Sequence, residues 1–308
     1  MLFTCRKLSA LLAGLLLSST VWAGKLAIVI DDFGYRPKEE NQILNMPQAI
    51  SVAVLPNSTH GKAMAIKAHQ MGHEVLIHLP MAPLSKQPLE KDTLRPDMSS
   101  AEIERIIREA VNDVPHAVGL NNHMGSAMTS NLFGMQKVMQ SLAKYNLYFL
   151  DSMTIGSSQS LRAAQGTGVK VIKRRVFLDD SQNEAEIRKQ FTRAVKLAQR
   201  DGSAIAIGHP HPSTVRVLQQ MLPSLPADVT LVRPSQLLNE PQRVNPAPLP
   251  KESSPPVSKP RNPFKPAGVC PNPHALKAMP DITGVEILAE SVANSEAMRY
   301  LQQRMIPR

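Results

Sequence analysis

The 308-residue chain contains little cysteine and tryptophan, with two Cys and one Trp. Cys5 and Trp22 both lie within the first 23 residues, so Cys270 is the only cysteine beyond that segment. One cysteine cannot form an intramolecular disulfide and cannot build a cysteine-based zinc site. The absence of tryptophan after residue 23 also disfavours a carbohydrate-binding module built on stacked tryptophan rings.

Motifs of several catalytic classes are missing as well. The sequence has no Gly-x-Ser-x-Gly nucleophile elbow, no Walker loop and no Gly-x-Gly-x-x-Gly fingerprint. No segment after residue 23 is apolar over the roughly 18 residues that a membrane-spanning helix requires. Since no nucleophile is evident, hydrolysis by an activated water is favoured over covalent catalysis.

The first 23 residues have the pattern of a secretory signal peptide. Arg6 and Lys7 precede a short apolar run, Leu11–Leu17, and Val21-Trp22-Ala23 resembles a cleavage site. We therefore expect export to the periplasm with cleavage after about Ala23. An uncleaved N-terminal anchor is the alternative, and only in that case do we expect association with a membrane.

The formal net charge of +10 is spread along the chain. Residues 24–239 contain 24 Lys and Arg against 19 Asp and Glu, and their densest basic run is Lys173-Arg174-Arg175. An exported domain with this distribution is a poor candidate for nucleic-acid binding. An anionic polymer of the cell wall fits the mild positive charge better.

Strand-like and helix-like patterns alternate from Lys25 to about Glu240. The expected strands are Leu26–Ile30, Ile50–Leu55, Glu74–His78, Ala117–Leu120, Leu147–Leu150, Val169–Ile172, Val176–Leu178, Ser203–Ile207 and Val229–Val232. The expected helices are Gly61–Met71, the segment after the Ser99-x-x-Glu102 capping box, Leu132–Tyr145, Glu184–Arg200 and Thr214–Leu222. This alternation predicts an α/β domain over residues 24–240, and about seven or eight βα units favour a barrel of parallel strands.

The composition changes after Glu240. Residues 240–273 hold eleven of the chain's 26 prolines. Such a segment cannot donate enough backbone hydrogen bonds to form a sheet, so residues 241–308 are expected to be a disordered, Pro-rich linker and tail.

Six of the expected strands end in ionisable or amide side chains. The residues in question are Asp31-Asp32, His78, Asn122-His123, Asp151, Asp179-Asp180 and His209-x-His211. Because parallel strands of a barrel end on one rim, we expect these side chains to converge there. The set favours a metal-dependent hydrolase.

Individual members of this set allow more than one interpretation. Asp31 and Asp32 can divide metal binding and proton transfer between them, since successive strand side chains point in opposite directions, or they can cap a helix. His123 can bind a metal with Asn122 orienting it, or both can belong to a loop. His209 and His211 can form a pair of metal ligands, or His209 can act as a general acid.

Six segments of the sequence resemble those of the divergent polysaccharide deacetylases, which are related to the NodB-homology carbohydrate esterases. The resemblance covers about Lys25–Asn239 and rests on VIDDFG (29–34), GHEVLIHLPM (72–81), GLNNHMGS (119–126), FLDS (149–152), RRVFLDD (174–180) and IGHPHP (207–212). It implies a NodB-like, distorted (β/α) barrel. It also implies that acetyl groups are removed from sugars with the help of a bound divalent metal.

The resemblance also implies residue roles. It makes Asp31 the catalytic base, Asp32 and His78 metal ligands, and His209 the general acid. The family's second metal His would fall on position 82, which is Ala in this chain, and His123 is its natural replacement. Three protein ligands and an open position suit zinc.

The predicted function is therefore an exported hydrolase that deacetylates a cell-envelope polysaccharide or glycan fragment. The residues expected to support the ligands or bind substrate are Asn122, Asp151, Arg174, Asp179 and His211. One alternative is an inactive barrel that binds a glycan or, through its Pro-rich tail, an envelope protein. Another is a different metal hydrolase in which His209 and His211 are both ligands.

Overall fold

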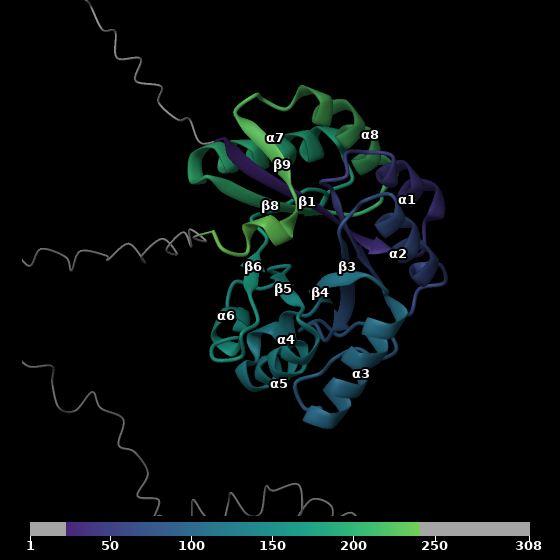
Figure 1. Ribbon diagram of the computed structural model, residues 1–308, viewed down its shortest axis with the longest axis vertical. Helices are drawn as coiled ribbons and strands as arrows, with labels where there is room; N and C mark the ends of the chain where they lie inside the picture. The colour runs from purple at the N-terminus through teal and green to yellow at the C-terminus, as the bar shows by residue number, and fades with distance from the viewer. Residues whose placement is uncertain (1–22, 241–308) are drawn as a thin grey trace, which may run out of the picture. The chain divides into compact units, whose positions relative to one another are not determined.

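The computed structural model describes residues 23–240 (Figure 1). The predicted signal peptide, apart from Ala23, and the predicted Pro-rich tail with Cys270 lie outside the described residues. Within residues 23–240, no helix is both long enough and apolar enough to cross a membrane.

Strands and helices alternate along the described residues. The strands are β1 (Gly24–Phe33), β2 (Ser51–Val54), β3 (Val75–Met81), β4 (Ala117–Met124), β5 (Tyr148–Asp151), β6 (Val171–Lys173), β7 (Val176–Phe177), β8 (Ser203–Gly208) and β9 (Val229–Val232). The α-helices are α1 (Pro37–Leu44), α2 (Gly61–Gln70), α3 (Ser100–Asp113), α4 (Ser126–Ser130), α5 (Leu132–Leu142), α6 (Ser160–Ala163), α7 (Glu184–Asp201) and α8 (Pro212–Met221). The short 3-10 helices are η1 (Ala143–Tyr145), η2 (Leu222–Ser224) and η3 (Pro234–Leu237). The predicted α/β class is confirmed.

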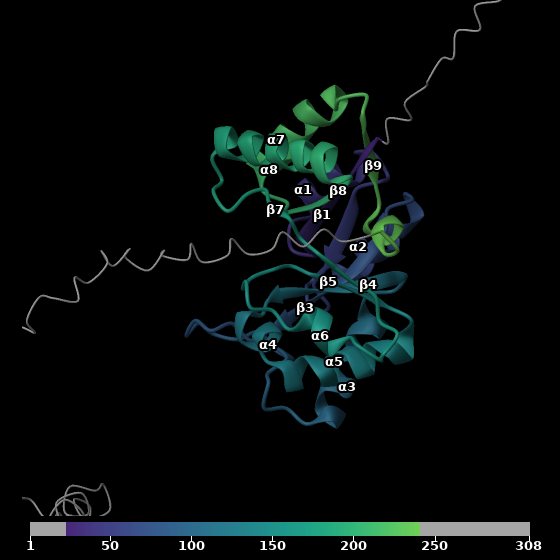
Figure 2. The ribbon, with the colours of Figure 1, turned by 90° about the vertical axis from the view of Figure 1, so that its left-hand side faces the viewer.

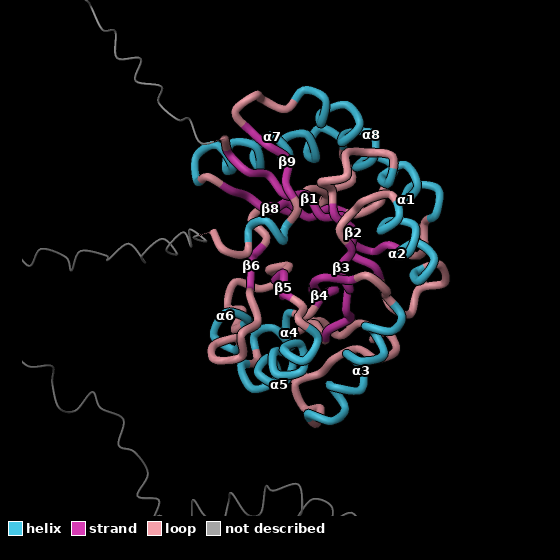
Figure 3. The backbone as a smooth tube through the Cα atoms, viewed as in Figure 1, coloured by secondary structure: helices cyan, strands magenta, loops and turns pink. Residues whose placement is uncertain are grey.

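All strand pairs are parallel, and the strands form one curled sheet with the helices outside it (Figures 1 and 3). Eight strands follow the order β6-β5-β4-β3-β2-β1-β8-β7, and β9 pairs with the first part of β1. Helix α7 packs on β8 and on α8, while α3 packs on β3 and on α5 (Figure 2). The path of eight strands matches the predicted barrel, and β9 is the predicted strand Val229–Val232, which lies off this path.

The two edges of this sheet, β6 and β7, are consecutive in the chain with only Arg174 and Arg175 between them. The Arg174 N–H donates to the Asp151 carbonyl at 3.0 Å, and the Arg175 N–H donates to the Ile205 carbonyl at 2.8 Å. One extended segment therefore pairs first with β5 and then with β8, and it joins the two edges without a β6–β7 ladder. This arrangement confirms the predicted distorted barrel.

Side-chain alternation divides the apolar residues of the strands into two cores. In β1, Leu26 and Ile28 belong to the large core between sheet and helices, whereas Ala27 and Val29 belong to the smaller core inside the barrel. Along several strands, the inward-facing residues are apolar at first and become polar at the carboxyl end. The polar residues are Asp31, His78, Asn121, His123, Asp179 and His209.

Helix α1 was not predicted, because PKEENQIL has only two apolar side chains apart from its proline, and these are adjacent in the sequence. Pro37 begins the helix, and the buried Glu40 secures the loop that precedes it. Glu40 Oε1 accepts hydrogen bonds from the backbone N–H groups of Gly34, Tyr35 and Arg36, at 2.8, 3.0 and 2.6 Å. The loop after Asp31-Asp32 is thus held by a carboxylate that sequence patterns did not reveal.

Truncation of Phe149 is expected to destabilise the fold strongly. This β5 side chain is fully buried in the large core, so Phe149→Ala should lower the free energy of unfolding by about 3–5 kcal/mol in urea denaturation. Phe133→Ala is the matched control, because that ring is 73% exposed, and its effect should stay within about 0.5 kcal/mol. Equal effects of the two substitutions would contradict this description of the core.

Candidate metal centre and catalytic residues

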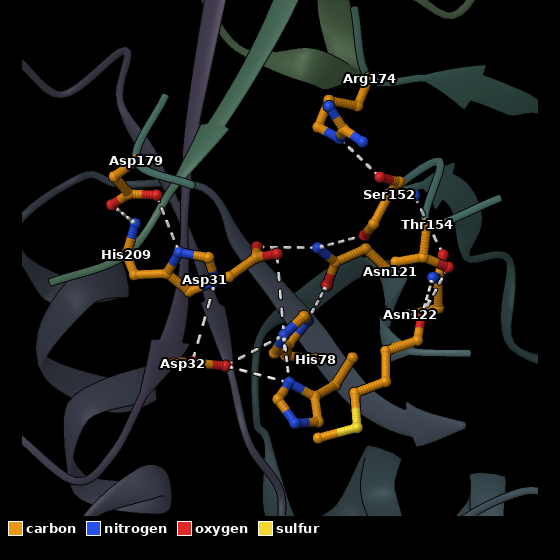
Figure 4. Close-up of polar contacts among 12 residues, drawn as sticks. Asp31, Asp32, His78, Asn121, Asn122, Ser152, Thr154, Arg174, Asp179 and His209 are labelled. Atoms are coloured by element: carbon orange, nitrogen blue, oxygen red, sulfur yellow. Dashed lines mark hydrogen bonds and ion pairs between the residues drawn. The ribbon is translucent and has the colours of Figure 1, made fainter. Parts of the chain in front are cut away.

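Polar side chains from five different strands or strand ends meet inside the barrel at its carboxyl rim (Figure 4). The residues brought together are Asp31, Asp32, His78, Asn121, His123, Asp179 and His209. The predicted catalytic and metal-binding residues all belong to this cluster. Asn121 is an additional member that the sequence-based site did not include.

Asp31 and Asp32 reach the same site, although strand alternation predicts that they point in opposite directions. The register between β1 and β2 shifts between Ile30 and Phe33, and Asp32 has a φ of 58°. This left-handed conformation, which Asp tolerates better than most residues, turns both carboxylates toward His78. Asp31 Oδ2 lies 3.7 Å and Asp32 Oδ1 lies 3.2 Å from His78 Nε2.

Three atoms suited to binding a metal form a nearly equilateral triangle. Asp32 Oδ1 is 3.2 Å from His78 Nε2 and 3.1 Å from His123 Nδ1, and the two nitrogens are 3.1 Å apart. Ligand atoms of a tetrahedral zinc ion are about 3.3 Å apart, given bonds of about 2.0–2.1 Å. Asp32 Oδ1 is also buried and accepts no hydrogen bond. These three residues therefore fit a divalent cation.

Asn121 determines which nitrogen of His78 faces this triangle. The Asn121 Nδ2 group donates to Asp31 Oδ1 at 2.8 Å, so its Oδ1 is left to accept from His78 Nδ1, also at 2.8 Å. A neutral His78 with its proton on Nδ1 presents the Nε2 lone pair to the triangle, as a metal ligand requires. Asn121 could have been identified from strand alternation, which places it on the same face as His123.

Burial and neighbouring charges shift the pKa values of Asp31, Asp32 and His78. Burial raises the pKa of Asp31, and the neighbouring Asp32 carboxylate adds to this effect. Burial would also raise the pKa of Asp32, but the adjacent His123 and His78 hold it well below its usual range. Burial opposes the charged form of His78, yet the carboxylates of Asp31 and Asp32 raise its pKa. At neutral pH, Asp32 is therefore an anion that attracts a cation.

His209 and Asp179 form a tightly held pair on the opposite side of Asp32. Asp179 Oδ1 accepts from His209 Nδ1 at 3.0 Å, and Oδ2 accepts from the His209 backbone N–H and from Thr214 Oγ1, both at 2.7 Å. The free Nε2 of His209 lies 3.8 Å from Asp32 Oδ2. Burial would lower the pKa of His209, but the hydrogen bond and charge of Asp179 outweigh it and raise the pKa to about 9. His209 is thus protonated at neutral pH.

A second group of potential ligands, Asp179, His209 and His211, has ligand atoms within 4.8 Å of one another. Both Asp179 oxygens already accept hydrogen bonds, however, and His211 Nδ1 faces the guanidinium Nη1 of Arg36 at 3.2 Å. Burial and the nearby cations His209 and Arg36 lower the pKa of His211. A carboxylate that already accepts three hydrogen bonds and an adjacent guanidinium make this group a poor cation site. The geometry disfavours the hypothesis in which His209 and His211 are both ligands.

Two predicted supporting residues hold loops outside the cluster. Asn122 donates from Nδ2 to the Met124 carbonyl at 2.6 Å and accepts from the Ser152 N–H at 3.0 Å. Arg174 donates from Nε to the Ser152 carbonyl at 2.5 Å and from Nη2 to the Met153 carbonyl at 2.8 Å. Both side chains therefore fix the segment after β5, and neither contacts the triangle.

Asp151 was predicted to support the ligands or bind substrate, and the structure places its side chain outside the cluster. It occupies an outer position of β5, because Tyr148 and Leu150 are the inner ones. Its Oδ1 accepts from the Met153 N–H at 2.8 Å, and its Oδ2 accepts from Ser158 Oγ and Ser160 Oγ at 2.6 and 2.5 Å. Asp151 thus stabilises the loop that leads to α6.

Replacement of Asp151 should accordingly affect stability and leave metal binding unchanged. Asp151→Ala removes the acceptor of three hydrogen bonds, so the free energy of unfolding should fall by about 1–3 kcal/mol. Urea denaturation and zinc titration measure the two quantities. Asp180→Ala is the control, because Asp180 is exposed. Loss of zinc affinity in Asp151→Ala would show that Asp151 does support the metal site.

The chain resembles known proteins in sequence and in structure. The chain is 66% identical to the uncharacterised protein YibQ of Escherichia coli, over 97% of this chain and 93% of that protein. It is 42% identical to an uncharacterised protein of Haemophilus influenzae, over 80% of this chain and 88% of that protein. A crystal structure of an uncharacterised protein of Agrobacterium tumefaciens superposes with a TM-score of 0.65 at 19% identity, covering 70% of this chain and 89% of the other, and shares the fold.

A family model described as divergent polysaccharide deacetylase matches residues 28–238. This range includes the whole cluster from Asp31 to His209 and nearly all of the described barrel. The chain therefore belongs to the divergent polysaccharide deacetylase family.

Proposed function

We propose that the protein is a hydrolase that removes acetyl groups from a glycan with the help of a divalent metal, with zinc as the expected ion. The observation that supports this most strongly is the triangle of Asp32 Oδ1, His78 Nε2 and His123 Nδ1. A buried carboxylate, Asp31, lies 3.7 Å from His78 of the triangle, and a protonated imidazole, His209, lies 3.8 Å from Asp32, in a member of a deacetylase family.

Asp31 acts as the general base in this proposal. Asp32, His78 and His123 would hold a divalent ion, whose positive charge would polarise the acetyl carbonyl and lower the pKa of an adjacent water. The raised pKa of Asp31 makes it a stronger base than an exposed carboxylate, and the hydrogen bond from Asn121 fixes its orientation. Asp31 takes one proton from the attacking water.

His209 acts as the general acid. Asp179 orients its ring through Nδ1 and stabilises its protonated form, so that Nε2–H is available to the leaving nitrogen or oxygen. Donation of this proton allows the C–N or C–O bond to break. Water and the acetylated sugar are thereby converted into acetate and the free amine or hydroxyl.

The envelope location of the substrate rests on the predicted signal peptide, which lies outside the described residues. Export would place the barrel beside acetylated polysaccharides of the cell wall. The Pro-rich residues 241–308 could in addition bind an envelope protein, which is a separate role from that of the barrel.

Acetate release from acetylated amino-sugar oligomers tests this function. Purified protein should release acetate, lose this activity after chelation and regain it when zinc is restored. A well-folded, zinc-loaded protein that releases no acetate from N- or O-acetylated oligomers would instead favour the inactive, glycan-binding barrel.

A further inference from the structure

We propose that Glu90 is a positioning residue for His123, fixing its tautomer so that Nδ1 points into the metal triangle. Glu90 lies on the loop between β3 and α3, and its Oε1 is 3.4 Å from His123 Nε2. This inference rests on the proposed metal centre, but it concerns how the protein prepares one ligand and does not require turnover.

The two nitrogens of His123 face different partners. Nδ1 lies 3.1 Å from both Asp32 Oδ1 and His78 Nε2, whereas Nε2 faces Glu90. A neutral imidazole carries its proton on only one nitrogen, and a carboxylate can only accept it. Glu90 therefore keeps the proton on Nε2 and leaves the lone pair of Nδ1 directed at the triangle.

The loop that carries Glu90 is tied back to the strand from which it leaves. The Ala82 N–H donates to the Leu94 carbonyl and the Leu94 N–H donates to the Pro80 carbonyl, both at 2.9 Å. Within the loop, the Glu90 carbonyl accepts from Thr93 Oγ1 at 2.7 Å and from the Thr93 N–H at 3.3 Å. These bonds hold Glu90 in a turn at the end of β3, next to the end of β4.

The immediate surroundings of the contact are partly apolar. Pro80, Met81, Pro88 and Leu89 line a small cavity together with Glu90 and His123. The Glu90 side chain is 39% exposed, so water screens the interaction in part. A charged acceptor can therefore hold the ring without the cost of complete burial.

The histidines of the triangle thus each have a side-chain oxygen facing the outer nitrogen. His78 uses the amide oxygen of Asn121, which comes from the neighbouring strand, and His123 uses the carboxylate of Glu90. The Ala82 carbonyl accepts from the N–H groups of Ala127 and Met128, which ties the start of the loop to α4. The loop that begins at Ala82 thereby supports a ligand on β4.

Zinc affinity of the full-length protein, measured by competition with a chromophoric chelator, tests this role. Glu90→Leu should weaken zinc binding by about 10–100-fold, the usual effect of removing the group that orients a ligating His. Glu90→Gln should restore most of the affinity, since its amide oxygen can still accept from Nε2–H. Lys91→Leu is the loop control, because the Lys91 side chain is 83% exposed and its ammonium pairs with Asp92 at 3.9 Å, away from His123. The zinc affinity of this variant should equal that of wild type.

Nitrogen NMR of the imidazoles in the zinc-free protein provides a second readout, because in that state no metal fixes the tautomer. Neutral His123 should carry its proton on Nε2 in wild type and Glu90→Gln, and Glu90→Leu should show a mixture of the two tautomers. Equal zinc affinity of Glu90→Leu and wild type would overturn the role, as would an equal loss in Lys91→Leu. A protein that binds zinc as expected but releases no acetate would refute the deacetylase activity and leave the role of Glu90 intact.

Discussion

Asp31→Asn should reduce kcat by about 10²–10⁴-fold, the range expected for loss of a general base. The substitution keeps the shape of the side chain and an oxygen that accepts from Asn121 Nδ2, but it removes the group that takes the proton from water. Asp31 is not part of the ligand triangle, so the variant should retain its metal. Acetate release and metal content of the same preparation measure both quantities.

Asp180→Asn is the matched control for this substitution, because Asp180 is an exposed carboxylate at the end of another strand. Its turnover should equal that of wild type. Undiminished turnover in Asp31→Asn would exclude Asp31 as the base. Loss of the metal in that variant would make Asp31 a ligand in place of a base.

His209→Gln should have a large effect that depends on the leaving group. With an N-acetyl sugar, which expels a poor leaving group, kcat should fall by about 10²–10⁴-fold, because the amine must be protonated as it departs. With an aryl acetate, whose phenolate leaves without protonation, the loss should be much smaller. The ratio of the two losses measures the contribution of the acid directly.

His211→Gln is the control for this experiment. Its imidazole faces Arg36 and is not hydrogen-bonded to Asp179, so the ratio between the two substrates should stay as in wild type. Equal losses on both substrates in His209→Gln would show that His209 does not protonate the leaving group.

Most of the fold could be predicted from the sequence, because the strands are short apolar runs and the longer helices are amphipathic. The predicted Glu184–Arg200 corresponds to α7, and the capping box at Ser99 precedes α3, where Ser99 Oγ accepts from the Glu102 N–H at 3.2 Å. Helix α1 could not be predicted in this way, since its stability comes from Pro37 and from the contacts of Glu40 with the preceding loop.

Prediction of the site depended on which face of each strand its polar residue occupies. The rule that polar residues follow apolar strands identified His78 and His209, but it also included Asp151, which lies on the outer face of β5. Strand alternation would have excluded Asp151 from the site and would have selected Asn121 in place of Asn122. No alternation rule predicts the conformation of Asp32, because a register shift and a positive φ bring it to the site.

The metal content of the full-length protein tests the central claim most directly. We expect about one zinc per chain in wild type and in His69→Ala, whose imidazole is exposed outside the cluster, and almost none in His78→Ala and His123→Ala. A well-folded wild type that binds no metal even when zinc is supplied would contradict the proposed centre. Retention of zinc by His78→Ala together with its loss from His211→Ala would also contradict it, by placing the ion at Asp179, His209 and His211.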